Sequence, residues 1–490
     1  MNRWRVHRYP MVVAVIAFMA GIILFDMVTL PWWALWGGFL LCLLLTAVGL
    51  RSRIGNLYIV AALVLFGGAV YSLRGFTPQL PVGRSLYMVL EVDDEPVVRK
   101  AFTVAPARII EYECDGATHA VEQRVNLYLD TLITADFATR IEALGRVVPF
   151  PEKFGSYGRL MSHRGFAGTV FLRSDDILKV ENLDKNRLHT SAVERLDRLG
   201  LAGDESAVIG AMAVGNRRRM TSELRQAYAR AGASHVLAVS GLHVGIVFLF
   251  FNLLLRRLSY LFYGNVIRAV LVVVPIWIYA AICGFSPSVV RAALMFTALQ
   301  IAVATSSHYV SLNILSATAF AMLVYRPDWL FDISFQLSFI AVVAILVWGV
   351  PIMGLLRTHV WWIDSLSATM VVGLVSSIAT MPLVAHTFGI VSIVGVLLNP
   401  IVILCAYIIV TLAVVWTIMP IAPIAGVYGW VLSAIGLGLN FVVKGVAAWS
   451  WSAVELELPA WAVWVIYGVA VAITMVVGNI KPKKSVPLQL

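Results

Sequence analysis

Two histidines and two serines gather in one short stretch, Gly232-Ala-Ser-His-Val-Leu-Ala-Val-Ser-Gly-Leu-His-Val-Gly245. Ser240 and His243 are three residues apart, so a helix would place them on one face. A serine beside a histidine can act as a nucleophile with its general base. The same side chains can instead pack helices together, or donate hydrogen bonds along a polar path. These residue types alone leave all three interpretations open.

The surroundings of this stretch favour a polar path. It stands at the head of an apolar run, where polar side chains are costly unless they face a protein interior or an aqueous cavity. Its glycines permit a broken helix, which lipid tolerates only beside such a cavity. The hydrolase interpretation is weaker, because Ala238-Val239-Ser240-Gly241 lacks the first glycine of the Gly-x-Ser-Gly element of rhomboid-type proteases. The candidate path residues are His235, Ser240, Gly241, His243, Gly245 and the intramembrane Arg291.

Other polar residues within apolar runs predict helix packing rather than a site. Asp332, Ser334, Gln336 and Ser338 recur every second residue, which distributes them around a helix. Asn399 precedes Pro400 in a long apolar run, where it can mark a kinked or re-entrant segment.

Several catalytic motifs are absent from the sequence. It contains no Gly-x4-Gly-Lys-Ser/Thr motif and no His-Glu-x-x-His motif. We therefore expect no ATPase, no metal or cofactor site and no catalytic residue, and thus a protein that is not an enzyme.

Composition identifies the class of protein that holds these residues. Of the 490 residues, 60% are hydrophobic and 13% are charged, against about 25% charged in soluble domains. The sequence therefore predicts a polytopic α-helical membrane protein. Runs of about 20 apolar residues predict about twelve spans, near residues 11–30, 32–50, 57–73, 236–255, 265–282, 288–305, 309–325, 333–350, 366–385, 390–416, 424–447 and 460–478.

A polar block between the third and fourth spans predicts an inserted all-β domain. Val125, Leu127 and Leu129 alternate with polar or aromatic residues, as in a half-buried strand. Similar stretches at 86–92, 102–112 and 168–172 bring the total to four or five short strands. That number fits a small OB-like barrel, a fold that often binds single-stranded nucleic acid, or equally a β-sandwich that only packs on the membrane part.

Charge predicts the orientation and the division of the chain. Arg3, Arg5 and Arg8 precede the first span, and three lysines follow the last, so both termini are expected in the cytoplasm. The β block is then extracytoplasmic. The predicted regions are a three-helix part (1–75), the OB-like domain (76–200), amphipathic interfacial helices (201–232), a transmembrane channel domain (233–480) and a basic tail (481–490).

The amphipathic segment carries a basic strip. Thr221 or Ser222 is expected to cap a helix whose apolar face includes Leu224 and Tyr228. Anionic lipid or a polyanionic cargo can bind such a strip, and lipid is the commoner partner. The residues of the strip are Arg217, Arg218, Arg219 and Arg225.

The stretch around Ser240-Gly-Leu-His-Val-Gly245 resembles the signature of ComEC-type competence proteins. Other matching elements occur in the family's order: Gly215-Asn-Arg217, Leu224-Arg-Gln-Ala-Tyr228, Ser286-Pro-Ser-Val-Val-Arg-Ala-Ala293, Arg326 to Ser338, Pro382, Phe388-Gly389 and Leu398-Asn-Pro400. Phe154-Gly-Ser-Tyr-Gly-Arg-Leu160 with Arg164-Gly165 is similar to an element of the family's outer domain, except that Gly155 replaces the usual acid.

The resemblance implies an inner-membrane channel that passes single-stranded DNA into the cytoplasm during natural transformation. It implies as partners the DNA, the lipid bilayer, a cytoplasmic motor ATPase and an extracytoplasmic DNA receptor. Many relatives continue into a metallo-β-lactamase-like domain, whereas this sequence ends at Leu490. Any nuclease is therefore expected on a separate chain. The alternatives are an intramembrane serine hydrolase around Ser240 and His243, and a non-conducting binding or scaffold protein.

Overall fold

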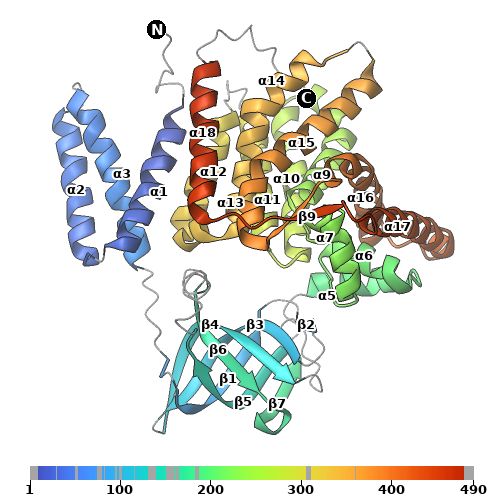
Figure 1. Ribbon diagram of the computed structural model, residues 1–490, viewed down its shortest axis with the longest axis horizontal. Helices are drawn as coiled ribbons and strands as arrows, with labels where there is room; N and C mark the ends of the chain where they lie inside the picture. The colour runs from blue at the N-terminus through green and yellow to red at the C-terminus, as the bar shows by residue number, and fades with distance from the viewer. Residues whose placement is uncertain are drawn as a thin grey trace.

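A computed structural model shows a helical region with a β-barrel on one side of it (Figure 1). The structure describes residues 9–28, 30–49, 53–73, 80–81, 83–93, 96–98, 102–114, 116–130, 139–150, 161, 165–182, 187–304, 311–358 and 360–478. The N-terminal arginines 3, 5 and 8, the 154–160 element with Arg164, and the 481–490 tail lie outside these residues.

The first three helices form a group of their own: α1 (Pro10–Met27), α2 (Trp32–Gly49) and α3 (Arg53–Leu73). Glycines bring α1 and α3 into backbone contact, because a Cβ at Gly21 would stand 2.0 Å from the carbonyl oxygen of Val64. Tyr71 on α3 donates a 2.5 Å hydrogen bond to Asp26 on α1. The group packs against the rest of the helical region through Phe18 and Ile22 of α1.

The polar block folds as an all-β domain, as the alternating sequence predicts, and it is a closed barrel, one of the two architectures that the pattern left open. Its strands are β1 (Ser85–Val92), β2 (Val97–Val98), β3 (Phe102–Cys114), β4 (Ala117–Asp130), β5 (Thr139–Val148), β6 (Phe166–Leu172) and β7 (Ile177–Asn182). Strand pairing closes a ring in the order β1-β3-β4-β6-β5 and back to β1, in which only β4 and β6 are parallel. The predicted strand number was too low, because β2, β5 and β7 were not singled out.

The barrel interior is an apolar core. Val125, Leu127 and Leu129 of β4 are at most 1% exposed, which confirms the predicted alternation. Met88, Leu90 and Ile109 from β1 and β3 complete the same core. Each buried side chain of this size contributes about 1.5–3 kcal/mol.

Four short helices connect the barrel to the helical region: α5 (Arg187–Asp197), α6 (Gly203–Val214), α7 (Ser222–Arg230) and α8 (Ser234–Leu237). We call them the α5–α8 layer. The predicted cap is confirmed, because Thr221 Oγ1 accepts the Leu224 N–H at 3.2 Å. Leu224 and Tyr228 are buried and Gly232 follows the helix at φ +74°, also as predicted.

The remaining helices are α9 (Gly241–Leu254), α10 (Gly264–Ile282), α11 (Pro287–Ala304), α12 (Ser311–Tyr325), α13 (Ile333–Ala344), α14 (Val350–Leu355), α15 (Trp361–Phe388), α16 (Gly395–Ile418), α17 (Ala425–Ala447) and α18 (Ala460–Gly478). A π-helical turn joins α13 to α14. A small antiparallel sheet pairs β8 (Ile390–Ser392) with β9 (Ala453–Glu455). Asn399-Pro400 lies inside α16 and does not end the helix.

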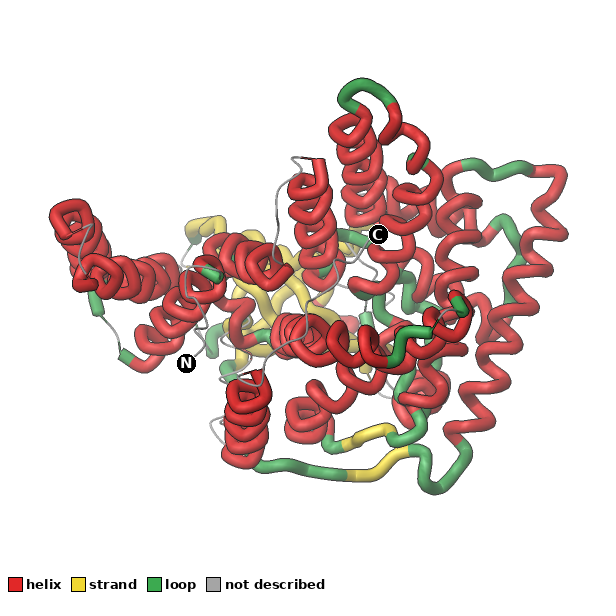
Figure 2. The backbone as a smooth tube through the Cα atoms, turned by 90° about the horizontal axis from the view of Figure 1, so that it is seen from above, coloured by secondary structure: helices red, strands yellow, loops and turns green. Residues whose placement is uncertain are grey.

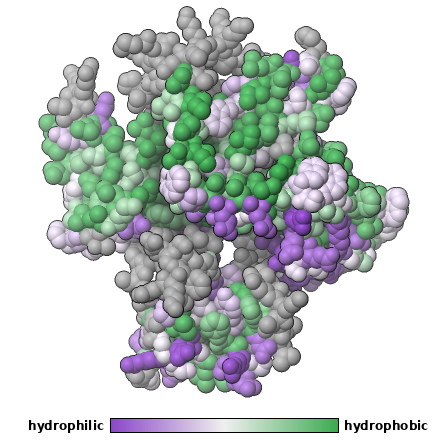
Figure 3. Space-filling model, viewed as in Figure 1, coloured by the Kyte–Doolittle hydropathy of each residue, from purple (hydrophilic) through white to green (hydrophobic). Residues whose placement is uncertain are grey.

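In the described part of the chain, seven helices are long and apolar enough to cross a membrane. Shorter apolar helices occupy the other five predicted spans, at 32–48, 241–254, 288–304, 311–325 and 460–476. Figure 3 shows apolar side chains covering the upright helices, with polar residues along the edge that faces the barrel. The chain is a membrane protein with an inserted β domain, whereas the number twelve stays a prediction.

Candidate functional site

The Gly232–Gly245 stretch forms a broken helix. Gly232 turns the chain after α7, and α8 provides a single helical turn. Ala238 and Ser240 are then extended, with ψ 134° and 175°, before α9 begins at Gly241. The predicted span at 236–255 is therefore interrupted, and its helical part starts at Gly241.

Ser240 and His243 together cap the N-terminus of α9. The Ser240 hydroxyl oxygen accepts the Leu242 N–H at 3.3 Å, and the Ser240 N–H donates to His243 Nδ1 at 3.0 Å. This reciprocal arrangement satisfies backbone donors that the first turn of a helix leaves free. Ser240 Oγ also lies 3.0 Å from His243 Nδ1. The predicted proximity of the two side chains is thus explained by capping.

The other ring nitrogen of His243 faces the protein interior. Because Nδ1 accepts a backbone hydrogen bond, a neutral His243 carries its proton on Nε2. The side chain is 0% exposed, and Nε2 has no hydrogen-bond partner among the described residues. His235 on α8 lies close enough to interact electrostatically with His243. A buried donor without an acceptor is unusual, because leaving it unsatisfied costs about 1–3 kcal/mol.

The two glycines of α9 allow close contact with α11. A Cβ at Gly241 would meet Ala292 at 3.5 Å, and one at Gly245 would meet Phe296 at 3.4 Å. Phe248 stacks on Phe296 at a centroid distance of 4.5 Å. Side chains of α11 therefore fill the space beside both glycines.

Arg291 lies on α11, next to the residue that Gly241 contacts. It is 2% exposed, its Nη2 donates to Ser334 Oγ on α13 at 3.0 Å, and its Nε has no described partner. Asp332 interacts with it electrostatically. The structure therefore places Arg291 inside the protein and not at the lipid surface.

Of the polar residues predicted to pack helices, only Ser334 has a described side-chain hydrogen bond to another helix, and the others have different contacts. Asp332 caps its own helix α13 by accepting the Ser334 N–H at 2.8 Å, and Gln336 donates to the Leu330 carbonyl at 2.9 Å. Ser334 bonds a neighbouring helix, whereas Ser338 is half-buried on α13. Asn399 is buried on α16 beside Gly373 of α15, and its Oδ1 has no described partner.

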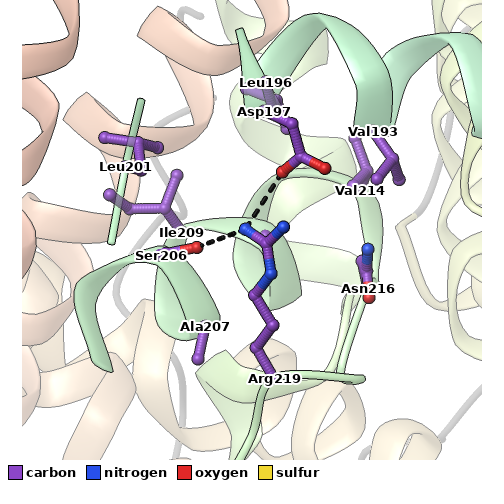
Figure 4. Close-up of a pocket in the computed structure, with 11 residues that line it drawn as sticks. Val193, Leu196, Asp197, Leu201, Ser206, Ala207, Ile209, Val214, Asn216 and Arg219 are labelled. Carbon is purple, nitrogen blue, oxygen red and sulfur yellow. Dashed lines mark hydrogen bonds and ion pairs between the residues drawn. The ribbon is translucent and has the colours of Figure 1, made fainter. Parts of the chain in front are cut away.

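At least part of the basic strip is engaged within the protein. Arg219 donates to Ser206 Oγ at 2.7 Å and pairs with Asp197 at 3.0 Å, across a pocket between α5 and α6 (Figure 4). This cavity of about 20 Å³ has room for roughly one water molecule, so it is too small for a substrate. Arg217 and Arg218 are exposed and Arg225 is half-buried.

Two polar contacts were not foreseen from the sequence. Asn252 of α9 accepts hydrogen bonds from Arg268 of α10 at 2.7 Å and Gln300 of α11 at 3.5 Å. Tyr228 of α7 donates to Asn440 of α17 at 2.8 Å, and burial raises the pKa of this tyrosine. Polar residues within apolar runs were the available signal. No cluster of metal-ligating side chains occurs among the described residues.

Comparison with known proteins places the chain in a family. A family model described as Competence protein matches residues 212–480, more than half of the 490 residues. The chain belongs to the competence protein family. The match includes α7 to α18 and therefore the broken helix, Arg291 and Asn399.

Two curated relatives align with part of this competence protein. An uncharacterized protein of Aquifex aeolicus (strain VF5) is 33% identical over 186 residues, 38% of this chain and 41% of that protein. ComE operon protein 3 of Bacillus subtilis (strain 168) is 31% identical over 204 residues, 41% of this chain and 24% of that protein. The alignments thus span less than half of either relative. No solved structure matches the chain.

Proposed function

We propose that this competence protein is an inner-membrane channel that passes single-stranded DNA into the cytoplasm during natural transformation. The observation that carries the proposal is the broken helix α8–α9 with the buried His243 donor at its head. A phosphate chain cannot cross hydrocarbon without hydrogen-bond donors. Membership of the family and the name of the Bacillus subtilis relative support a role in DNA uptake.

The burial of the proposed path residues fits a closed state of such a channel. His243 and Arg291 are almost completely buried, and α11 fills the space beside Gly241 and Gly245. His243 Nε2 and Arg291 Nε lack partners in the described protein. Separation of α9 from α11 would expose both donors, and phosphate oxygens would then satisfy them. In this proposal His235 and Ser240 line the mouth of the same path.

The serine hydrolase is the less favoured function. Ser240 Oγ lies 3.0 Å from His243 Nδ1, the distance of a nucleophile and its base. However, that nitrogen already accepts the Ser240 N–H, and no described group orients the ring through Nε2. Catalytic histidines are held by such a third group. We therefore propose that the protein is not an enzyme.

For the barrel we propose an OB-like domain on the extracytoplasmic side. Its five-stranded ring, with one parallel pair, supports that assignment. Three aromatic rings from neighbouring strands adjoin: Phe102 lies 5.3 Å from Tyr128, and Tyr128 lies 4.9 Å from Phe171. Phe171 is 59% exposed and the other two rings are half-buried. Accessible aromatic rings stack on the bases of single strands. Both termini are then cytoplasmic, and a cytoplasmic motor ATPase and an extracytoplasmic DNA receptor are the expected partners.

The test replaces His243 by glutamine or leucine. Glutamine at this position completes the same capping arrangement with Ser240 and still offers an N–H donor, but it cannot accept a proton as a base. For a channel, His243→Gln retains most of the transformation frequency and His243→Leu abolishes it. Protein level and periplasmic DNA capture are measured alongside and should stay unchanged in both variants.

Ser240→Ala is the matched control. It removes one cap, worth about 1 kcal/mol, and leaves His243 in place, so we expect a milder loss than with His243→Leu. A hydrolase requires that His243→Gln and Ser240→Ala are both as inactive as His243→Leu. If His243→Leu transformed as well as the wild type, His243 would neither line a channel nor act as a catalytic base. Its only remaining role would be in helix packing.

A further inference from the structure

Helix α17 has one buried and one exposed face along its whole length. Leu432, Leu439 and Val443 are at most 1% exposed on one side. Val427 and Phe441, 69% and 80% exposed, lie on the other. The neighbouring helix α16 exposes apolar side chains near its start and at its end, namely Leu397, Ile401, Leu404 and Ile418. A continuous exposed apolar face needs an apolar partner.

The buried faces of both helices rest on the α5–α8 layer. Near one end of α17, a Cβ at Gly429 would stand 2.5 Å from the carbonyl oxygen of Leu199. In the middle Tyr228 bonds Asn440, and near the other end Lys444 pairs with Asp204 at 2.6 Å.

Both ends of α16 contact the same layer. Its first residue, Gly395, packs on Gly232, because a Cβ added at Gly395 would lie 3.1 Å from the Gly232 Cα. Trp416, near its last residue, donates to the Arg195 carbonyl at 2.8 Å. A helix of 24 residues is about 36 Å long, enough to cross a bilayer. It nevertheless begins and ends beside one layer.

The α5–α8 layer lies on the side of the helical region that faces the barrel (Figure 1). It follows the last barrel strand after four residues, and its other side exposes Arg217, Arg218 and Glu223. Such charges are expensive in hydrocarbon. Figure 3 shows polar side chains below the green region on the side where Figure 1 places α5–α7.

We propose that α16 and α17 lie flat in the membrane leaflet on the barrel side, with their exposed faces covered by lipid acyl chains, and do not cross the membrane. In Figure 2 the two long helices at the right edge run along the page, whereas the upright helices of Figure 1 are seen closer to end-on. In Figure 3 some apolar side chains lie at the right, beside those of the upright helices, where Figure 1 places α16 and α17.

The connection between α16 and α17 supports this placement independently. Residues 418–425, Ile-Met-Pro-Ile-Ala-Pro-Ile-Ala, contain no charged residue, although a twelve-span topology places them in the cytoplasm. Short cytoplasmic loops are normally rich in lysine and arginine. Met419 is 61% exposed and both Ile421 and Ile424 are 43% exposed, so the tip is apolar as well. It is suited to lipid.

If α16 and α17 do not cross the membrane, ten of the twelve predicted spans remain. Ten is again an even number, so both termini stay on the same side as predicted. The proposal is independent of DNA transport. It assigns the partner of one surface, the acyl chains of a single leaflet, and it places the flat pair beside the broken helix through the Gly232–Gly395 contact.

The experiment measures depth in the bilayer at three positions on the exposed face of α17. In a background without Cys42, Cys114, Cys283 and Cys405, a fluorophore is attached at Val427→Cys, Ala434→Cys or Phe441→Cys. The full chain is reconstituted in vesicles with nitroxide quenchers at the headgroup or at two acyl depths. Neighbouring positions are seven residues, about 10 Å, apart along the helix. A flat helix gives one common depth, within roughly 3 Å, whereas a crossing helix gives depths that differ by about 10 Å or more.

Leu366→Cys, Leu374→Cys and Met381→Cys on α15 are the matched control, because this upright helix should give three different depths. Different depths on α17 would overturn the proposal. So would quenching of all three α17 probes by aqueous iodide and not by acyl-chain nitroxides. A common depth within the acyl region, with the control series spread, supports it. Neither result depends on whether the protein transports DNA.

Discussion

The barrel and the helical region differ in how they satisfy buried polar groups. In the barrel, the Asp93 side chain is 5% exposed and is paired with two arginines, Arg108 at 2.6 Å and Arg124 at 3.3 Å. In the helical region, His243 is 0% exposed and Arg291 is 2% exposed, yet each keeps a nitrogen without a partner among the described residues. The buried carboxylate Asp93 is therefore paired, whereas these two donors of the helical region stay open. In the described part of the barrel, the Nε of Arg140 is also buried without a partner, so the contrast concerns these three residues and not every polar group of each region.

This difference separates groups that stabilise the fold from groups that await a ligand. A paired buried carboxylate holds three strands together, and its removal should affect stability first. An unpartnered buried donor adds nothing to stability, because it has lost its hydration without a replacement. Its removal should affect transport first. Mutations that break the pairing of Asp93 with the barrel arginines should therefore lower stability and spare transport. Mutations that remove the open donors of α9 and α11 should lower transport and spare stability.

Among the variants that test this comparison beyond those at His243, the largest expected effect is that of Arg291→Met. A buried ionic group can be replaced by an apolar side chain of similar volume with little loss of stability. A lost charge-assisted hydrogen bond is worth about 1.5–3 kcal/mol, which corresponds to roughly a 10- to 150-fold change. We therefore expect transformation to fall by at least about tenfold for one lost phosphate contact. The melting temperature of the purified protein should stay within roughly 2 °C.

Ser334→Ala is the control for Arg291, because it removes only the described hydrogen bond of the guanidinium. We expect transformation within about threefold of wild type, since a neutral partner contributes only about 1 kcal/mol. If Arg291→Met instead unfolds the protein, the arginine belongs with the stabilising groups and the comparison fails.

Asp93→Asn should have the opposite phenotype and a smaller effect. The two arginines are 42% and 38% exposed, so solvent screens their pairing, and we expect a loss of about 1–2 kcal/mol. Backbone amides of β3 and β4 should then exchange with deuterium about 5- to 30-fold faster. Transformation at moderate temperature should change little.

Glu122→Gln is the matched control for Asp93. Its side chain is 81% exposed and 4.0 Å from Arg108, so exchange in the barrel should be unchanged. Faster exchange in both variants would show that net charge, and not the buried pairing, stabilises these strands.

The sequence predicts the barrel better than the helical region, for a physical reason. Alternation along a strand directly encodes which side chains face the core, as Val125, Leu127 and Leu129 demonstrate. The closure of the ring between β1 and β5 was not predictable, because pairing of strands far apart in sequence leaves no local signal.

In the helical region, length and hydropathy located apolar helices but did not distinguish their orientations. Helix α17 is apolar enough to cross a bilayer, yet its position beside α5–α7 depends on single contacts such as Tyr228 with Asn440. The proximity of Ser240 and His243 followed from their spacing. Their capping role did not, because it required the break at Ala238.

The smallest expected effect is a pH dependence at the junction of the two regions. His189 on α5 lies with Nδ1 2.8 Å from the Ile282 carbonyl at the end of α10, and burial lowers the pKa of this histidine. When α5 opens, the pKa returns to its ordinary value of about 6.5. Below that pH the open state binds a proton more readily than the closed state does. The free energy that holds α5 closed therefore falls as the pH falls, until the pH reaches the lower pKa of the closed state. Above about pH 6.5 this free energy does not change with pH. Deuterium exchange of α5, corrected for the intrinsic rate, should therefore be faster at pH 5.5 than at pH 7.5.

His189→Asn removes this titration and keeps an N–H donor for the Ile282 carbonyl. Its corrected exchange in α5 should be the same at both pH values, while the wild-type rates differ. The exchange of β3 and β4 should not follow this pH dependence, because His189 belongs to the layer and not to the barrel. An equal pH dependence in the variant would assign the effect to other groups. If α5 and the barrel strands showed the same pH dependence, the two regions would open together. The barrel and the helical region would then differ in how their buried polar groups are paired, but they would unfold as one unit.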